Sequence, residues 1–207
     1  MYLGGCATAL YINDPFALDV RATVDVDCII DVVSLIEYHQ FESQLIEKGF
    51  KKSIEDDVIC RFHCDEIILD VMPTDQKILG FGNPWYKEAL LYAVNHTIAD
   101  DLIIKSISAP YFLATKFEAF KTRGNSDVLG SHDYEDIISV IAGRVNLVEE
   151  VRDASSGLKN KIKEEFKQLL QNDQFERTLP GYVNDGPATM RNVKVVIDRI
   201  NQIITNG

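Results

Sequence analysis

The chain has 207 residues, of which 46% are hydrophobic and 26% charged, so it can bury a core without disulfides or a structural metal. No apolar run approaches the roughly 20 residues of a membrane span, and the opening MYLGGCATALY lacks the basic start of a secretory signal, which predicts a cytoplasmic protein with no membrane partner. The net charge of −11 argues against broad, sequence-blind binding of nucleic acid.

The first fifty residues predict a strand, a turn, a second strand and a helix. The apolar MYL is followed by Gly4 and Gly5 and then by the helix-like CATALY. The stretch VDVDCIIDVV (24–33) is rich in β-branched residues and predicts a strand. Residues 34–49 have helical apolar spacing, with Ser34 as the N-cap and Gly49 as the stop.

Two further strands and a short helix follow. DVICRFHC (57–64) and DEIILDVMPT (65–74) predict strands joined by a tight polar turn, and a short helix is expected from Trp85. Within the first strand, Cys60, Phe62 and Cys64 alternate onto one face, which favours core packing of the cysteines. A zinc site using Cys60, His63 and Cys64 is the alternative.

The second half predicts only helices. Helices are expected over 109–124 and 131–144, the latter opening on Ser131, and residues 145–172 form either two helices or one long helix weakened at 155–157. The final helix carries an apolar side made of Met190, Val193, Val196, Ile197, Ile200 and Ile204. The predicted fold class is therefore α+β: a small mixed sheet with helices over 1–105, then an all-helical part over 106–207.

Three aspartates mark the predicted sheet. Asp25 and Asp27 alternate onto one face of their strand, and Asp70 directly follows the apolar run of another. If the strands are neighbours, the three carboxylates converge and repel unless divalent cations lie between them, and oxygen ligands suit Mg²⁺. Two metal ions roughly 3.5–4 Å apart can activate an attacking oxygen and neutralise a leaving one in phosphoryl transfer.

Groups that could hold phosphate lie beside these acids in the sequence. Gly4 and Gly5 let the backbone approach a phosphate closely, and a helix starting near Ala7 would point free N–H groups at the same place. Arg21 alternates with Thr23 and would share the face of the acids, supplying a guanidinium fork. The sequence therefore predicts a metal-assisted triphosphate site.

These motifs resemble a known group. LGGCATALY followed by RATVDVD resembles the glycine turn and R-x-T-x-D-x-D motif of the polymerase-β-like nucleotidyltransferase superfamily, specifically the group of AbiEii/AbiGii-type toxins. YFLATKFEAFKTRG followed by SHDYEDIISVIAGR is similar to that group's helical lysine, basic loop and acidic D-x-x-D helix. The resemblance covers residues 3–27 and 111–144, with Asp70 between them.

The resemblance implies a nucleotidyltransferase core over 1–105 and a helical domain over 106–207 that completes the active-site cleft. Asp25, Asp27 and Asp70 would be the catalytic and metal-binding residues, holding two Mg²⁺ or Mn²⁺ ions, with Asp70 also helping to activate the acceptor hydroxyl. The implied nucleotide-binding residues are Gly4, Gly5, Arg21, Thr23 and Lys116, and the implied supporting residues are Asp133 and Asp136.

The implied function is transfer of an NMP from an NTP to an acceptor hydroxyl on RNA, such as tRNA, or on protein. The chain would then act as the toxin of a toxin–antitoxin pair, with an antitoxin protein as partner. An RNA acceptor would need an electropositive channel, for which the candidates are Lys105, Lys116, Lys121 and Arg123. Two departures from the family pattern are expected to weaken activity: Gly5 replaces a common serine, and the sequence begins close to the turn, where relatives carry a preceding helix.

Other interpretations stay open. Asp25 and Asp27 could form a solvated strand end with Arg21 as their ion-pair partner. The fold could also serve as a catalytically weak nucleotide-binding or partner-binding module. An aspartate-nucleophile phosphatase is disfavoured, because its D-x-D pair follows an apolar strand, whereas here the apolar residues 28–30 come after the pair.

Overall fold

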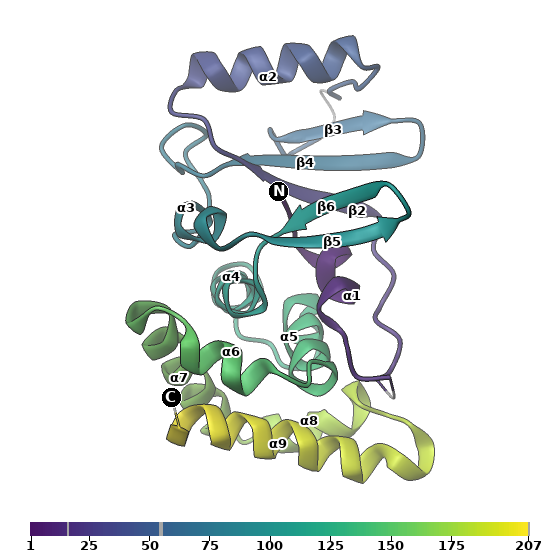
Figure 1. Cartoon of the computed structure of the whole chain (residues 1–207), viewed down its shortest axis with the longest axis vertical. Helices are drawn as coiled ribbons and strands as arrows, with labels where there is room; N and C mark the ends of the chain where they lie inside the picture. The colour runs from purple at the N-terminus through teal and green to yellow at the C-terminus, as the bar shows by residue number, and fades with distance from the viewer. Residues whose placement is uncertain (16, 54–55, 207) are drawn as a thin grey trace. The chain divides into compact units, whose positions relative to one another are not determined.

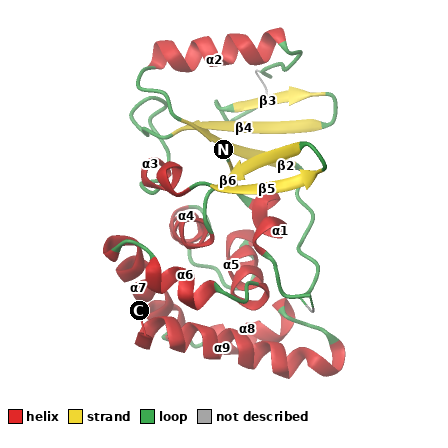
Figure 2. Cartoon of the chain, in the orientation of Figure 1, coloured by secondary structure: helices red, strands yellow, loops and turns green. Residues whose placement is uncertain are grey.

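The computed structural model describes residues 1–15, 17–53 and 56–206 and shows an α+β protein (Figures 1 and 2). The chain divides into two compact units. The sheet unit comprises Met1–Ala7 and Ala22–Ser108, and the helical unit comprises Thr8–Arg21 and Ala109–Gly207. The predicted boundary at 105/106 is therefore close to the observed one at 108/109, but the assignment of Thr8–Arg21 to the helical unit was not predicted.

Within the described residues, the sheet unit contains one six-stranded mixed sheet in the order β3-β4-β2-β1-β6-β5. The strands are β1 (Tyr2–Leu3), β2 (Asp25–Ile30), β3 (Arg61–Cys64), β4 (Ile67–Pro73), β5 (Val94–Ala99) and β6 (Leu102–Ser106). β2 pairs in parallel with β4, and β1 with β6, while the other neighbouring pairs are antiparallel. The predicted mixed sheet is confirmed.

Helix α2 (Leu35–Glu47) covers one face of β3 and β4, as Figure 1 shows. Ser34 caps the helix by accepting a hydrogen bond from the Glu37 backbone N–H, and Gly49 ends it with a φ of +96°. The apolar contact between helix and sheet is built from Leu45, Phe62 and Val71. Both predicted ends of this helix are confirmed.

The hairpin of β3 and β4 was predicted, and that of β5 and β6 was not. The first turns at Asp65, which has a φ of +51°. α3 (Tyr86–Ala89) and the 3-10 turn η2 (Leu90–Tyr92) precede the second, whose apolar residues Ile98 and Ile103 are at least half exposed. β5 is an edge strand, so the hairpin lacks the buried face that produces a clear alternation of apolar and polar residues.

The helical unit contains α1 (Thr8–Tyr11), α4 (Ala109–Thr122), α5 (His132–Gly143), α6 (Leu147–Asp153), α7 (Ser156–Leu170), α8 (Phe175–Tyr182), the 3-10 turn η3 (Gly186–Ala188) and α9 (Thr189–Asn206). Of the two predicted alternatives for 145–172, the structure has two helices, because Ser155 caps α7. On α9 the prediction for Met190 is wrong, since 70% of this residue is exposed. No helix in the described ranges is long and apolar enough to cross a membrane.

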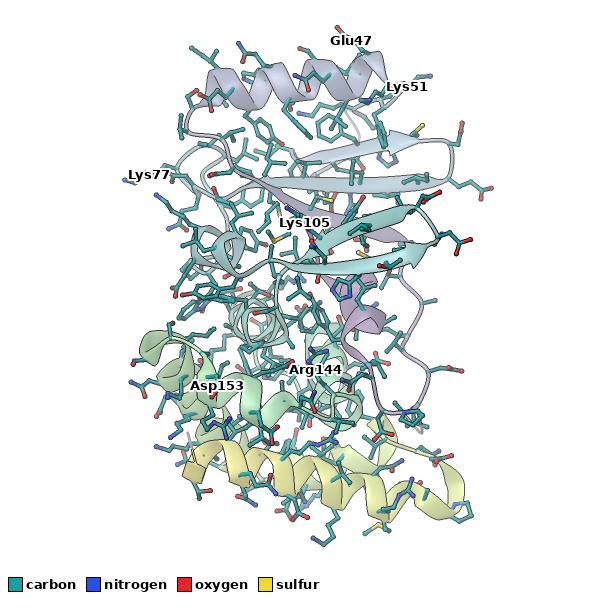
Figure 3. The ribbon with its side chains drawn as sticks, in the orientation of Figure 1. Glu47, Lys51, Lys77, Lys105, Arg144 and Asp153 are labelled. Atoms are coloured by element: carbon teal, nitrogen blue, oxygen red, sulfur yellow. The ribbon has the colours of Figure 1, made fainter. Side chains whose placement is uncertain are left out.

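The segment 8–21 is bound into the helical unit by its side chains and its backbone. The ring of Tyr11, which is 1% exposed, lies 4.6 Å from that of Phe112 between centroids. Arg144, labelled in Figure 3, donates to the Tyr11 carbonyl at 2.9 Å and forks onto Glu150. The Gly143 carbonyl accepts hydrogen bonds from two backbone N–H groups of the segment. The first helix after the glycine turn therefore completes the core of the helical unit.

Candidate functional site

The structure brings the three predicted catalytic aspartates to one face of the sheet unit. β2 and β4 are adjacent parallel strands, and Asp27 and Asp70 are direct partners across them. Asp25 lies two residues before Asp27, so its side chain shares that face, while Val71 points to the opposite face beneath α2. The prediction that the two acid-bearing strands are neighbours is confirmed.

The glycine turn adjoins this acidic face. Gly4 has a φ of +74°, which L-residues with side chains rarely adopt. A Cβ placed there would overlap Oδ2 of Asp27, so only glycine leaves room for that carboxylate. After the turn, Gly5–Ala7 form a 3-10 turn, and α1 starts at Thr8, next to the expected helix start near Ala7. The backbone of Gly4 thus lies close to the Asp27 carboxylate, and the helix that follows, α1, has only four residues.

Arg61, which the sequence argument did not select, lies on the same face. It pairs with Asp70 across β3 and β4, and its Nε and Nη2 atoms donate to the two Asp70 carboxylate oxygens at 2.8 and 2.7 Å. Its Nη2 also lies 3.6 Å from Oδ2 of Asp25. Hydrogen bonding to Asp70 raises the pKa of the guanidinium. The alternation of side chains along the strand could have identified Arg61, because the residue next to a core-facing Phe62 must lie on the opposite face of the sheet.

The acidic face fits magnesium in residue type. Asp25, Asp27 and Asp70 offer carboxylate oxygens from adjacent strands, and oxygen is the ligand that Mg²⁺ prefers. Asp70 is only 7% exposed, with both of its oxygens bonded to Arg61. Over the described ranges, no three His, Cys, Asp or Glu side chains gather closely enough to hold a metal ion. A cation bound by all three acids would have to displace Arg61 from Asp70.

Arg21 and Thr23 do not extend the strand of the acids. β2 begins at Asp25, so the alternation argument does not reach either residue, and placing Arg21 on that face by alternation was wrong. Arg21 belongs to the helical unit, where its Nε and Nη2 atoms donate to the two oxygens of Asp136 at 3.1 Å each. The Thr23 hydroxyl donates to the Asp25 carbonyl at 3.4 Å. Their predicted contacts with a nucleotide remain predictions.

Four of the predicted residues meet in one charged cluster of the helical unit. Lys116, which is 4% exposed, places its Nζ 3.0 Å from Oδ1 of Asp133 and 2.6 Å from Oδ2 of Asp136. Asp136 also holds Arg21, and Asp133 accepts two bonds from Arg123 at 2.9 Å each. A buried lysine is expected to be paired in this way. The two aspartates therefore fix these cations, and the supporting role that the resemblance implied for them stays a prediction.

The charges of this cluster favour the ionised forms of Asp133 and Arg21. Burial alone would raise the pKa of Asp133, but the hydrogen bonds from Arg123 and the charge of Lys116 outweigh it, and the pKa is lowered. Burial would likewise lower the pKa of Arg21, yet its bond to Asp136 raises that pKa. Asp133 and Arg21 are thus stabilised as ions by their partners in the cluster.

The cations suggested for an RNA channel are largely paired with acids. Lys121 lies 2.6 Å from Oε2 of Glu165, and Lys116 and Arg123 are bound to aspartates as described. Lys105, labelled in Figure 3, lies on β6 of the other unit. Within the described helical unit, these residues therefore provide no unneutralised basic surface for a nucleic acid.

In the Cys-x-x-His-Cys stretch, Arg61–Cys64 form β3 and Cys60 is the residue before it, so the strand is shorter than the predicted 57–64. Cys60 is 2% exposed, and burial raises the pKa of its thiol to about 11, which disfavours the thiolate that zinc requires. His63 pairs with Asp56, with Nε2 and Oδ2 separated by 2.7 Å. This geometry supports core packing over zinc binding.

No protein-family model matches the chain, and no curated protein matches it either. The assignment of function consequently depends on the chain's own residues and their geometry.

Proposed function

We propose that the protein is a metal-dependent nucleotidyltransferase that moves an NMP from an NTP to an acceptor hydroxyl. The single observation that supports this most is the shared face of Asp25, Asp27 and Asp70 on adjacent parallel strands, next to the turn at Gly4. Three like charges concentrated on one face are unfavourable unless they serve a cation. The AbiEii/AbiGii-type core suggested by the motifs uses carboxylates in this role.

In the proposed reaction, an acceptor oxygen attacks the α-phosphate in line and pyrophosphate leaves. Mg²⁺, when bound, would neutralise charge on the phosphates. Asp25, Asp27 and Asp70 would hold the cation, and Asp70 would also accept the proton of the acceptor hydroxyl. Gly4 would serve the site by leaving room for the carboxylate of Asp27 beside the turn. The protein's contribution is mainly positioning and charge neutralisation.

The acceptor and the biological role belong to the same proposal. Toxin activity, with an antitoxin partner, follows only from the resemblance. The net charge of −11 and the paired lysines of the helical unit provide little attraction for RNA, so protein hydroxyls belong beside tRNA among the acceptors to be tested.

The test is a transfer screen with the intact protein, each of the four α-labelled NTPs, Mg²⁺, and total RNA or total protein as acceptor. We expect one nucleotide to label one acceptor class, and Asp25→Asn to abolish labelling while the circular dichroism spectrum stays unchanged. Asp153→Asn is the matched control, because Asp153 is an exposed carboxylate paired with Arg152 in the helical unit. Labelling retained by Asp25→Asn would refute the assignment.

A second candidate is a catalytically weak nucleotide-binding or partner-binding module. The observation in its favour is that Arg61 already neutralises Asp70 with two hydrogen bonds, so that the acidic face has a resident counter-ion. Nucleotide binding in equilibrium dialysis, without labelling of any acceptor by any of the four NTPs, would favour this module over the enzyme.

A further inference from the structure

The inference concerns how the acidic face of the sheet unit is regulated, and it rests on the proposed function. Asp25, Asp27 and Asp70 contribute three negative charges to that face, and Arg61 contributes one positive charge among them. The guanidinium is fixed at two points. It forks onto both oxygens of Asp70, at 2.8 and 2.7 Å, and reaches to 3.6 Å from Asp25. It therefore links two carboxylates that a divalent cation would also have to use.

We propose that Arg61 is a built-in competitor of the divalent cation, which must displace the guanidinium from Asp70 before all three aspartates can act together. Two features support competition over simple coexistence. Both oxygens of Asp70 are engaged by the guanidinium, and the Asp70 side chain is only 9% exposed, so little of it is accessible to a further ligand. A guanidinium fork is among the strongest partners of a carboxylate, and its positive charge repels a second cation at this range.

The position of Arg61 in the sheet makes displacement feasible. It is the first residue of β3, and its side chain is 24% exposed, so it can turn toward solvent without disturbing the core. Its neighbour Phe62 anchors the strand on the opposite face, with no exposed area. Arg61 is therefore a positioning residue: it keeps Asp70 in place and sets the cation concentration at which the three acids become available.

The experiment measures binding of Mn²⁺ alone, without nucleotide, by counting the free ion with electron paramagnetic resonance. The full-length wild type is compared with Arg61→Gln, which removes the charge, and Arg61→Lys, which keeps the charge and loses the fork. We expect Arg61→Gln to bind Mn²⁺ at least about tenfold more tightly than wild type, and Arg61→Lys to lie between them. The rise in Tm on adding Mn²⁺ should follow the same order.

Two controls separate the outcomes. Arg152→Gln removes a similar arginine fork, on the exposed Asp153 of α6, and should leave the dissociation constant unchanged. Asp25→Asn should weaken binding in every background. The circular dichroism spectrum of each variant establishes that it is folded, and Arg61→Lys, which keeps a cation among the acids, serves if Arg61→Gln does not fold.

Equal or weaker binding by both Arg61 variants, with binding still dependent on Asp25, would overturn the competition and leave the proposed metal site standing. Mn²⁺ binding that is unchanged by Asp25→Asn, or no Mn²⁺ binding by any variant, would instead refute the metal site of the proposed function, and the competition with it. The two failures are thus distinguishable in one titration series.

Discussion

The backbone of Gly4 and the carboxylate of Asp27 lie so close together that any side chain at position 4 would overlap Oδ2 of that carboxylate. The contact links the glycine turn to β2, since Leu3 and Asp27 are register partners. Glycine is thus required at position 4 for two reasons: the backbone there is left-handed, and Asp27 occupies the space that a side chain would fill.

Gly4→Ala should therefore cost more stability than backbone strain alone explains. A positive φ costs an L-residue about 1–2 kcal/mol, and displacing Asp27 should add at least about 1 kcal/mol. Gly49→Ala is the matched control, because its φ is +96° and nothing lies within 4 Å of its added Cβ. Urea unfolding gives both losses. Equal losses in the two variants would show that Asp27 adapts without cost.

Lys116→Met should destabilise the protein strongly, because it leaves two buried carboxylates each with one cation fewer. We expect a loss of about 2–4 kcal/mol in the free energy of unfolding, reduced from the usual cost of breaking a buried pair because Arg21 and Arg123 remain. Lys194→Met removes an exposed pair with Asp198 and should change stability by less than about 0.5 kcal/mol. A loss no larger than in that control would mean that the cluster contributes little to folding.

Asp133 should make stability depend on acid pH. Its pKa is lowered in the folded protein, so its stabilising contribution is present above the unfolded value of about 3.9 and is lost as the pH falls through the lower folded value. Between about pH 5 and pH 2, wild type should therefore lose more unfolding free energy than Asp133→Asn. Urea titrations at each pH provide the difference curve. Parallel curves would contradict an ionised Asp133 in the cluster.

Tyr11→Ala should unfold the helical unit more readily, although Tyr11 precedes the sheet strands β2–β6 in the sequence. The side chain is 1% exposed against Phe112, and truncating a buried aromatic side chain costs about 3–5 kcal/mol. Tyr92→Ala, at a residue that is 50% exposed, should cost less than about 1 kcal/mol. Hydrogen exchange should show the lost protection in α4 and α5. Lost protection confined to the sheet would contradict the assignment of residues 8–21.

How much the sequence could predict depends on how far apart along the chain the interacting residues lie. The cap at Ser34, the stop at Gly49 and the strand that carries Asp70 depend on neighbouring residues, and all were predictable, although Asp70 lies in the middle of β4 and not at its end. Arg21 was misplaced because its partner Asp136 is 115 residues away and because β2 starts four residues after it. Arg61 was missed because the fork onto Asp70 depends on strand register, which a single strand pattern does not define.

The candidate site was predictable in part for the same reason. The shared face of the acids follows from alternation together with one correct assumption about strand order. Lys116 was recognised by its motif, but its bonds to Asp133 and Asp136 depend on the packing of α4 against α5, which no local pattern specifies.

Because Thr8–Arg21 belong to the helical unit, they also constrain how the protein folds during its synthesis on the ribosome. Arg144, which binds the carbonyl of Tyr11, is 123 residues beyond Arg21, a delay of roughly 6–25 s at ordinary elongation rates. During that interval the early apolar segment has emerged, yet its final neighbours do not exist. Nascent chains stalled before residue 109 should therefore display this segment to chaperones and proteases, and release it only once α4 and α5 have been synthesised.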